Sequence, residues 1–288
     1  MSKQIKFFDL ENNVLMPLRS IDNDLFISSY DFDQTSGKFL VVEPYDEDGS
    51  QGGRVVIYPQ SPQLKINEIT ILKTFNRYGS LYYPLDAKFD YVRRRIWIAD
   101  TGNNRVLKVR IDPGTVSFEI TGITYPHALA ADLNIGGVLV KGYTGKTMQT
   151  GIVAHYKSNG EELSSFRYDL RDADSSSSSS SFEGLLSSSS SSGEGTVPQM
   201  PSVDSLKYDH VRSRGWWVAK TKVYMIDEIN HQVKTYDLRD DDFYFVYSLD
   251  IELSSGNAFI VAGDNHDERF VVQMFRDNNV VIGTGYIE

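Results

Sequence analysis

The feature that most constrains this fold is a pattern that occurs five times along the chain. Its sharpest copy, residues 83–110, contains three short apolar runs separated by polar turns: Leu85 to Phe89, Ile96 to Ala99 and Arg105 to Ile111. The other copies extend over residues 28–59, 125–155, 203–238 and 247–275. Each run has the length and residue types of a β-strand, and long stretches with helical spacing are absent. The pattern predicts an all-β chain built from repeated small sheets.

An acidic residue closes the first strand of each copy. These residues are Asp33, Asp90, Asp132, Asp209 and Glu252. Their spacing is 57, 42, 77 and 43 residues, and the longest step contains a serine-rich insertion. Without roughly 33 residues of insertion that step becomes about 44, the length of a four-stranded propeller blade. A sheet of this size cannot bury both faces alone, so we expect the sheets to stack in a β-propeller.

The whole chain, residues 1–288, is interpreted as a single β-propeller domain of five to six blades. Five copies are present, and the flanks Gln4 to Leu18 and Asn279 to Glu288 could pair to close the ring or supply most of a sixth blade. The composition agrees, because 24 Val, 17 Tyr and 15 Phe greatly outnumber 10 Ala, which favours strands over helices.

The second strand of the sharpest copy and the turn after it carry a family resemblance. Residues 96–106, IWIADTGNNRV, together with Tyr83-Pro84 and the turn at Asp90, closely resemble the signature of NHL-repeat β-propellers. The other copies keep only the apolar skeleton of that signature. In the turn, Asp and Asn side chains cap the backbone, and we expect Arg105 to pair with an acidic residue of the next blade. The resemblance implies a propeller fold and identifies no ligand.

A serine-rich segment, residues 170–200, interrupts the repeats. Thirteen of the 31 serines of the chain lie between Ser175 and Ser192. Polyserine buries too little apolar area to offset its ordering entropy, so we expect a flexible loop inserted between two blades. It is either a tolerated low-complexity expansion or a docking arm in which Phe182, Leu185 and Leu186 anchor on a partner protein.

Charge and composition narrow the classes of function. Asp and Glu (39) exceed Lys and Arg (29), for a net charge of -10, which argues against a nucleic-acid binder. The absence of cysteine excludes thiol catalysis, Cys-ligated zinc and disulfides. No run of 18 apolar residues predicts a membrane span, and residues 1–12 lack the apolar core of a signal peptide. We expect a soluble protein, synthesised in the cytoplasm and open to incorporation into a virion.

A metal site is one alternative to a purely structural role. Enzymes that resemble this family, lactonases and amidating lyases, gather His or acidic ligands around the central channel. Asp86, His127 and Asp204 lie at the starts of first strands and are the candidates for the channel mouth. Polar channel residues that bind only water are the other interpretation. The pattern predicts no catalytic residue and no cofactor.

Two further groups of residues are candidates for partner contacts. Trp216 and Trp217 are adjacent, so in a strand they point to opposite faces, either into blade interfaces or toward a protein or glycan. Arg93 to Arg95 form the densest basic run, interpreted as a solvated hairpin or as a surface for an acidic partner.

Taken together, these residues favour a non-enzymatic propeller scaffold for protein–protein contacts in a larger assembly. Its composition is similar to that of virion proteins associated with phage tails or capsids. The alternatives are a metal-dependent propeller enzyme, lactonase- or lyase-like, and a glycan-binding adhesin that uses Trp or Tyr platforms.

Overall fold

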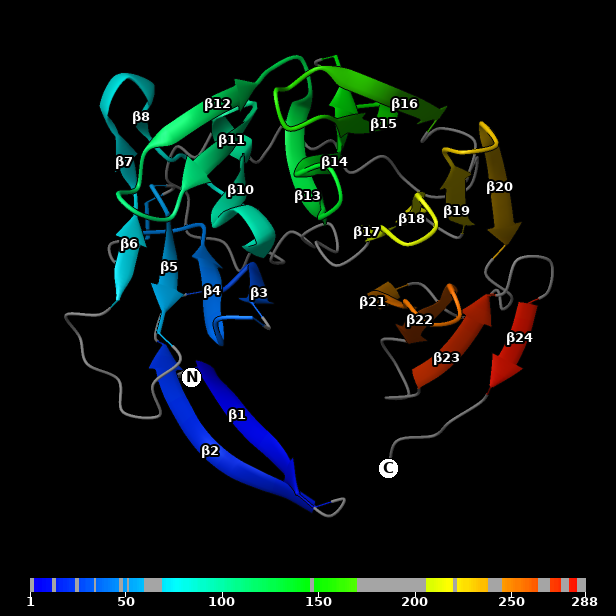
Figure 1. Cartoon of the computed structure of the whole chain (residues 1–288), viewed down its shortest axis with the longest axis horizontal. Coiled ribbons are helices and arrows are strands. Elements are labelled where there is room, and N and C mark those ends of the chain that lie inside the picture. The colour runs from blue at the N-terminus through cyan, green and yellow to red at the C-terminus, as the bar shows by residue number, and fades with distance from the viewer. Residues whose placement is uncertain are drawn as a thin grey trace, which may run out of the picture.

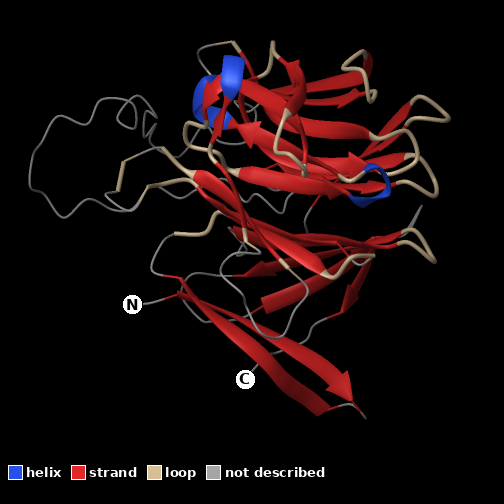
Figure 2. Cartoon of the chain, turned by 60° about the vertical axis from the view of Figure 1, so that its left-hand side comes forward, coloured by secondary structure: helices blue, strands red, loops and turns tan. Residues whose placement is uncertain are grey.

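The structure is a computed structural model. It describes residues 3–11, 14–23, 26–33, 35–46, 49–50, 52–59, 69–145, 148–169, 206–219, 222–237, 245–263, 270–275 and 280–283. Within these residues the protein is nearly all β (Figure 1). The helices are single 3-10 turns at strand ends (Figure 2), namely η2 (Asn76–Tyr78), η3 (Tyr91–Arg93) and η4 (Thr101–Asn103).

Each of the five repeats forms one four-stranded antiparallel sheet in which consecutive strands pair. The first sheet contains β3 (Ser29–Asp33), β4 (Lys38–Glu43), β5 (Arg54–Tyr58) and β6 (Thr70–Leu72). The second contains β9 (Asp86–Asp90), β10 (Arg95–Asp100), β11 (Arg105–Arg110) and β12 (Val116–Ile120). The third contains β13 (Thr124–Asp132), β14 (Gly137–Thr144), β15 (Thr150–Tyr156) and β16 (Glu162–Asp169).

The last two repeats have the same topology. The fourth sheet contains β17 (Leu206–Asp209), β18 (Arg214–Ala219), β19 (Lys222–Asp227) and β20 (Gln232–Asp237). The fifth contains β21 (Phe245–Glu252), β22 (Asn257–Gly263), β23 (Phe270–Phe275) and β24 (Val280–Gly283). The repeat analysis of the sequence is thereby confirmed, including the three strands expected between residues 85 and 111.

The sheets follow one another along an arc, with the first strand of each sheet innermost (Figure 1). Contacts between β3 and β9, β9 and β13, β13 and β17, and β17 and β21 join these inner strands. This arrangement fits a β-propeller, although the described sheets do not close a ring. A smaller hairpin of β7 (Thr74–Phe75) and β8 (Gly79–Ser80) extends from the rim between the first and second sheets.

Among the described residues of the two chain flanks, the strands pair otherwise than one alternative expected. β1 (Lys3–Glu11) pairs with β2 (Val14–Asn23) as a separate two-stranded hairpin. β24 instead pairs with β23 as the fourth strand of the fifth sheet. A hairpin forms because only two residues separate β1 from β2, so local closure costs less entropy than pairing with the distant C-terminal segment. The hairpin lies at the open side of the arc (Figure 1).

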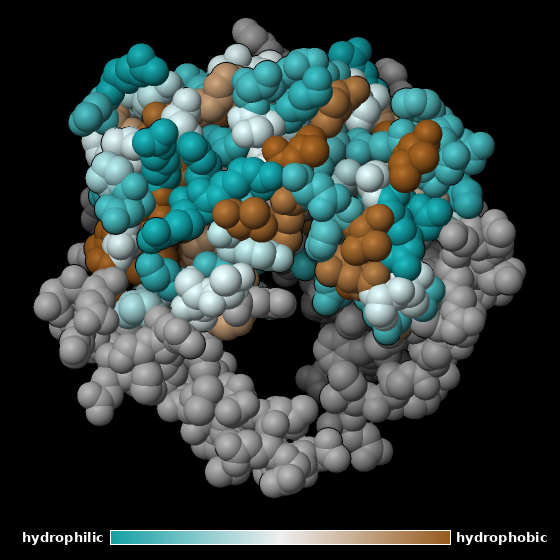
Figure 3. Space-filling model, in the orientation of Figure 1, coloured by the Kyte–Doolittle hydropathy of each residue, from teal (hydrophilic) through white to brown (hydrophobic). Residues whose placement is uncertain are grey.

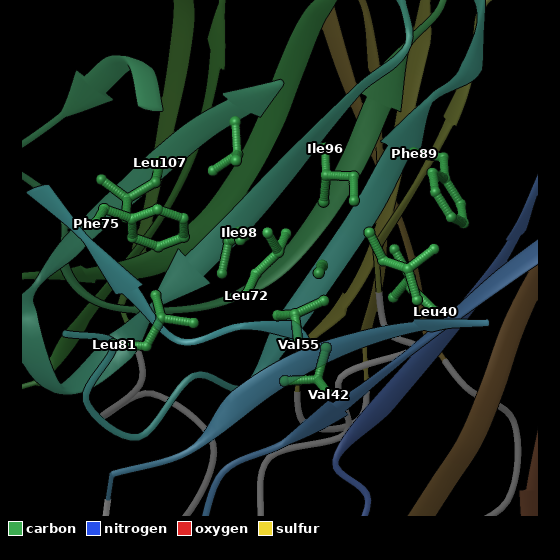
Figure 4. Packing of buried hydrophobic residues seen from close by; sticks show 13 residues of the cluster. Leu40, Val42, Val55, Leu72, Phe75, Leu81, Phe89, Ile96, Ile98 and Leu107 are labelled. Carbon is green, nitrogen blue, oxygen red and sulfur yellow. The ribbon is translucent and has the colours of Figure 1, made fainter. Parts of the chain in front are cut away.

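The hydrophobic core lies between neighbouring sheets, because side chains alternate between the two faces of each strand. One cluster joins the first and second sheets and includes Leu40, Val42, Phe89, Ile96 and Ile98, all buried (Figure 4). Further clusters join the second to the third, the third to the fourth and the fourth to the fifth sheet. In the described residues, no helix has the length and hydropathy needed to span a membrane.

Candidate functional site

The turns that follow the five inner strands make up the candidate site. Each inner strand ends at the acidic residue that the repeat spacing identified: Asp33, Asp90, Asp132, Asp209 and Glu252. We call the turns after them, residues 35–37, 91–94, 133–136, 210–213 and 253–256, the turn face. These acidic side chains hold the turns in shape. Asp209, for example, accepts hydrogen bonds from the backbone N–H groups of Val211 at 3.0 Å and Arg212 at 3.1 Å.

The fourth residue after each acidic residue has a left-handed backbone. Its φ is 65° at Gly37, 53° at Arg94, 66° at Gly136, 53° at Ser213 and 75° at Gly256. Such a residue reverses the chain tightly enough to begin the next strand of the hairpin, and glycine adopts this conformation without steric cost. The five turns therefore share one geometry, although only three of them contain glycine at this position.

An arginine of the second sheet ties its turn to that of the third sheet. Arg93 lies 3.2 Å from the carboxylate of Asp90, three residues earlier. Its Nη1 donates to the carbonyl of Leu133 at 3.0 Å, and its Nη2 donates to the carbonyl of Asn134 at 2.7 Å. The guanidinium therefore crosses from one sheet to the next, and the carboxylate keeps it in that position.

The fourth sheet repeats this arrangement toward the fifth. Arg212 lies 3.2 Å from Asp209 and donates to the carbonyls of Leu253 and Ser254, both at 2.9 Å. Between the two arginines, the side-chain amide of Asn134 donates to the carbonyl of His210. Hydrogen bonds thus run from turn to turn across four sheets, in one direction around the arc, and show that these turns lie on the same face.

Where an arginine crosses, the residue at the fourth position of the next turn is glycine, and a larger residue would contact the arginine. A Cβ atom on Gly136 would lie 2.6 Å from Cδ of Arg93, and one on Gly256 would lie 2.7 Å from Nε of Arg212. Neither distance is compatible with a normal contact. Glycine at the fourth position is therefore associated with an arginine supplied by the preceding sheet.

Apolar side chains protrude from the same turns. Val92, Ile135, Val211 and Leu253 are all exposed, one on each of four consecutive sheets. Figure 3, which views one face of the molecule, shows hydrophobic residues in separate brown patches among hydrophilic ones rather than in one continuous area. Spaced apolar groups on a rigid hydrogen-bonded frame are suited to contact with a protein surface.

A buried ionisable cluster lies between the third and fourth sheets at this end of the strands. Nδ1 of His155 donates to the Glu228 carboxylate at 2.8 Å, and its Nε2 lies 3.2 Å from Oδ2 of Asp132. Glu228 also accepts hydrogen bonds from Ser164 at 2.7 Å and from the Tyr208 hydroxyl at 2.9 Å. Because Ser164 donates to the carboxylate rather than to the imidazole, these residues are not arranged as a nucleophile with its base.

The charges of this cluster stabilise one another. Burial favours the neutral imidazole, but contacts with Asp132 and Glu228 outweigh it and raise the pKa of His155 above its ordinary value of 6.5. Burial also opposes ionisation of the two carboxyl groups, yet their contacts with His155 lower the pKa of each. These contacts therefore favour the protonated form of His155, which links a carboxylate of the third sheet to one of the fourth.

Asp86, the first channel candidate, is engaged in contacts among three sheets. It is fully buried, accepts a hydrogen bond from Ser29 at 2.5 Å and from the N–H of Leu129 at 2.7 Å, and lies 2.9 Å from Nζ of Lys88. Burial raises the pKa of Asp86, and the Lys88 charge opposes that rise. Both carboxylate oxygens thus have partners from neighbouring inner strands.

His127, the second channel candidate, has a hydrogen-bond partner other than Asp86. His127 is buried, and its Nδ1 donates to the carbonyl of Tyr125 at 3.1 Å. Burial and the nearby Lys141 charge lower the pKa of His127 to about 3, so its imidazole is neutral. Asp204 lies outside the described residues. No group of three or more His, Asp or Glu side chains suited to a metal ion occurs in the described part of the chain.

The two tryptophans are placed in the interior rather than at a surface. Both are fully buried. Trp216 packs with Leu249 and Ile260 of the fifth sheet, and Trp217 packs in the cluster that joins the third and fourth sheets. Strand alternation sends these adjacent side chains to opposite interfaces, so neither indole is presented to a partner. Phe182, Leu185 and Leu186 of the serine-rich segment lie outside the described residues.

The turn that carries the family resemblance is a structural cap, but Arg105 does not pair with the next sheet as expected. Asp100 accepts hydrogen bonds from the N–H of Tyr82 at 2.8 Å and from Arg105 at 2.6 Å. Arg105 also lies 3.5 Å from Glu119, so it pairs within its own sheet and not with the next one. The link to the third sheet comes from Thr101 instead, whose hydroxyl donates to the carbonyl of Pro126 at 2.6 Å.

Sequence reasoning missed the roles of Arg93, Arg212 and His155. Arg93, Arg94 and Arg95 are adjacent in the densest basic run, but only Arg93 lies three residues after a closing acid. The spacing Asp-x-x-Arg occurs in the second and fourth repeats. In the third and fifth repeats, glycine is the fourth residue after the closing acid. The positions of these residues relative to the closing acids are the sequence signal for the crossing arginines. His155 has no comparable signal, because its partners come from distant segments.

Comparisons with known proteins address the fold. No family model matches the chain, and no curated protein matches its sequence. Among solved structures, the chain is similar to one in the crystal structure of the mitotic checkpoint complex, with 10% sequence identity and a TM-score of 0.61. The alignment covers 98% of this chain and 71% of the other. At this identity the likeness concerns the fold alone, and it agrees with the propeller-like stacking of the five sheets.

Proposed function

We propose that this chain is a non-enzymatic β-propeller scaffold that binds other proteins through its turn face. The observation that carries the proposal is the set of four exposed apolar side chains on consecutive turns, Val92, Ile135, Val211 and Leu253. Cross-sheet hydrogen bonds from Arg93, Asn134 and Arg212 fix their spacing. A rigid surface loses little conformational entropy on binding, which favours association.

The buried ionisable groups support a structural role. Asp86 joins three inner strands, and His155 joins the third sheet to the fourth. The similar solved structure belongs to a multi-protein complex by its own description, which is compatible with a scaffold role here. We further propose an NHL-like propeller of five to six blades, with residues 170–200 inserted between the third and fourth. A place in a virion remains a prediction from composition.

The test replaces the four apolar side chains together: Val92→Ser, Ile135→Ser, Val211→Ser and Leu253→Ser. The matched control replaces Leu163 and Val233, which are exposed on outer strands. Native mass spectrometry of the protein isolated from its source should show loss of partner chains for the first variant only. Deletion of Ser175 to Ser192 in a third variant tests the docking arm.

Retention of partners by the fourfold variant would contradict binding through the turn face. A wild-type protein that is a free monomer, and whose melting temperature rises with divalent metal, would instead favour the metal-dependent enzyme. Binding of glycans without any protein partner would favour the adhesin.

A further inference from the structure

The buried ionisable cluster between the third and fourth sheets lies at the base of two turns of the turn face. Asp132 is the closing acid of the third inner strand, and its Oδ1 accepts a hydrogen bond from the N–H of Asn134 in the adjacent turn at 2.9 Å. Its Oδ2 lies 3.2 Å from Nε2 of His155. One carboxylate therefore contacts both the imidazole and the turn that carries Ile135, so the charge of His155 acts on that turn.

The other side of the cluster belongs to the fourth sheet. Nδ1 of His155 donates to Glu228 at 2.8 Å, and Glu228 accepts a hydrogen bond from the hydroxyl of Tyr208 at 2.9 Å. Tyr208 comes one residue before Asp209, the closing acid whose turn carries Val211. The imidazole thus connects the turns of the third and fourth sheets, which are the middle two of the four turns with exposed apolar side chains.

The position of the ring is suited to a proton on each nitrogen. A carboxylate only accepts hydrogen bonds, and a neutral imidazole has a single N–H. A neutral His155 therefore donates to one carboxylate and presents a lone pair to the other. Loss of a donor is costly here, because only 2% of the His155 side chain and 4% of the Asp132 side chain are exposed to water that could replace it. The imidazolium ion donates to both carboxylates.

The titratable groups around His155 come from several elements. Among the described side chains, Asp132 at the end of β13 and Glu228 after β19 contact its ring nitrogens, and Tyr208 of β17 has its ring centroid 5.0 Å from that of the imidazole. Lys141 of β14 belongs to the same interface but lies further from the turns, since β14 pairs with β15 so that Leu139, not Lys141, is opposite His155. The immediate charged neighbours of the imidazole are therefore both acidic.

These neighbours determine the pH range in which the contact is complete. Burial opposes protonation of His155, but its hydrogen bonds and charge interactions with Asp132 and Glu228 outweigh burial and raise its pKa above 6.5. The contact with both carboxylates is therefore complete below pH 6.5 and is lost as the pH rises through the raised pKa. Burial and the charge of Glu228 raise the pKa of Tyr208, so its hydroxyl stays protonated over the same range.

Resting on the scaffold function proposed above, we propose that proton binding at His155 regulates the turn face by fixing the turns of the third and fourth sheets relative to each other. With His155 protonated, Ile135 and Val211 keep one spacing and the surface binds its partner protein. With His155 neutral, one carboxylate loses its donor, the two turns move apart and binding weakens. The hydrogen bond from Asn134 to the carbonyl of His210 contains no titratable side chain, so it keeps the turns from separating completely.

The junction between the second and third sheets provides a comparison within the same molecule. There Arg93 donates to the carbonyls of Leu133 and Asn134, at 3.0 and 2.7 Å. A guanidinium stays charged at every pH at which the protein is studied. The spacing between the turns of Val92 and Ile135 should therefore not depend on pH.

Spin labels test the proposal on the protein alone, because the chain has no cysteine of its own. The pair Ile135→Cys and Val211→Cys spans the His155 junction, and the pair Val92→Cys and Ile135→Cys spans the arginine junction. All three positions are exposed, so the labels replace no packed side chain. Double electron–electron resonance measures both distance distributions from pH 6 to pH 10. We expect the first distribution to lengthen and broaden and the second to stay constant. A constant first distance, or an equal change in both pairs, would overturn the proposal.

The variant His155→Gln removes the group that binds the proton and keeps an N–H donor. Its Ile135–Val211 distance should be independent of pH and should match that of the wild type at pH 10. Circular dichroism confirms that the variant is folded, and if it is not, the two label pairs in the wild-type background still decide. His210 and His231 remain in the variant, so a pH response that persists there would assign the change to another group and overturn the proposal.

Partner binding is measured separately. Native mass spectrometry of the complex isolated from its source should show loss of partner chains between pH 6 and pH 10 for the wild type, and no such difference for His155→Gln. Loss of partners from the fourfold turn-face variant at pH 6, together with a pH-independent label distance, would support the scaffold function and overturn its regulation. Retention of partners by the fourfold variant would contradict the scaffold function whatever the labels show.

Discussion

Two interfaces of this molecule have the same architecture and different chemistry. Between the first and second sheets, the cluster that includes Leu40, Phe89 and Ile98 consists of apolar side chains (Figure 4), and the buried charge at this interface, Asp86, lies on the inner strand. Between the third and fourth sheets, aromatic packing around Trp217 is accompanied by His155 between two carboxylates. Nζ of Lys141 also donates to the carbonyl of Val218 there, at 2.7 Å.

Stacked sheets can therefore be joined by apolar contacts or by buried charges. Only the stability that comes from the buried charges depends on pH. Apolar burial has no titratable group, so its contribution to stability does not vary with proton concentration. The stability of the interface between the third and fourth sheets depends on the charge of His155. Burial there also lowers the pKa of Lys141 to about 7. Four substitutions test this comparison and the turn face, in order of decreasing expected effect on the free energy of unfolding.

Ile98→Ala should reduce the free energy of unfolding most, by about 2–5 kcal/mol, because Ile98 is fully buried in the apolar cluster. Denaturant unfolding at several pH values between 5 and 9 measures the change, and we expect its size to be the same at each pH. The control Ile71→Ala, at an exposed position, should change stability by less than about 0.5 kcal/mol. A strong pH dependence of the Ile98 effect would contradict the comparison.

His155→Gln should destabilise the protein by about 2 kcal/mol near pH 6, through loss of charge-assisted contacts with Asp132 and Glu228. The pKa of His155 is raised in the folded state, so its stabilisation is complete below 6.5 and is lost as pH rises through the raised pKa. The pKa values of both carboxyl groups are lowered, so stabilisation is also lost at acid pH, below their ordinary values of 3.8 and 4.5.

The measurement is the difference in unfolding free energy between wild type and His155→Gln as a function of pH. Other titrating groups, including Lys141 and the buried neutral His127, contribute equally to both proteins and cancel. Tyr208 and Ser164 also face Glu228, and both remain in the variant. A difference that grows from pH 6 to pH 9 would contradict a protonated His155.

Gly136→Ala should cost about 1–2 kcal/mol, because its φ is 66° and the added Cβ would lie against Arg93. Gly122, with φ of 96° and open space around its Cβ position, is the control for backbone strain alone. In a double-mutant cycle with Arg93→Ala, the excess cost of Gly136→Ala over the control should disappear. If that excess persists, contact with Arg93 is not the cause of the extra destabilisation by Gly136→Ala.

Val211→Ser should have the smallest effect on stability, within about 0.5 kcal/mol, because the side chain is exposed on the turn face. Thermal unfolding checks this expectation and establishes that the fourfold variant tests binding rather than folding. A drop of several degrees in the melting temperature would place Val211 in the packing of the fold.

Much of the fold was accessible from particular residues. The five closing acids located the end of every inner strand, because a carboxylate at that point caps a tight turn that recurs once per sheet. The adjacent residues Trp216 and Trp217 predicted side chains on opposite faces of one strand, and the structure places them in two different interfaces. The prediction that these tryptophans contact a partner was wrong, because both are fully buried. The alternation of side chains along a strand does not indicate whether a neighbouring sheet covers a face.

The sequence by itself determined the five repeats, three strands of the sharpest copy and the acidic residue that ends each inner strand, since hydrogen bonding between neighbouring strands is local. Only the tertiary structure decided which side chains meet across sheets: Arg93 with the turn of the third sheet, and His155 with Asp132 and Glu228. It also showed that Tyr30 is exposed, whereas the equivalent residues of the other four sheets are buried. These contacts depend on how complete sheets stack. The free energy gained by burial between sheets is proportional to the apolar area removed from water and does not depend on distance along the sequence.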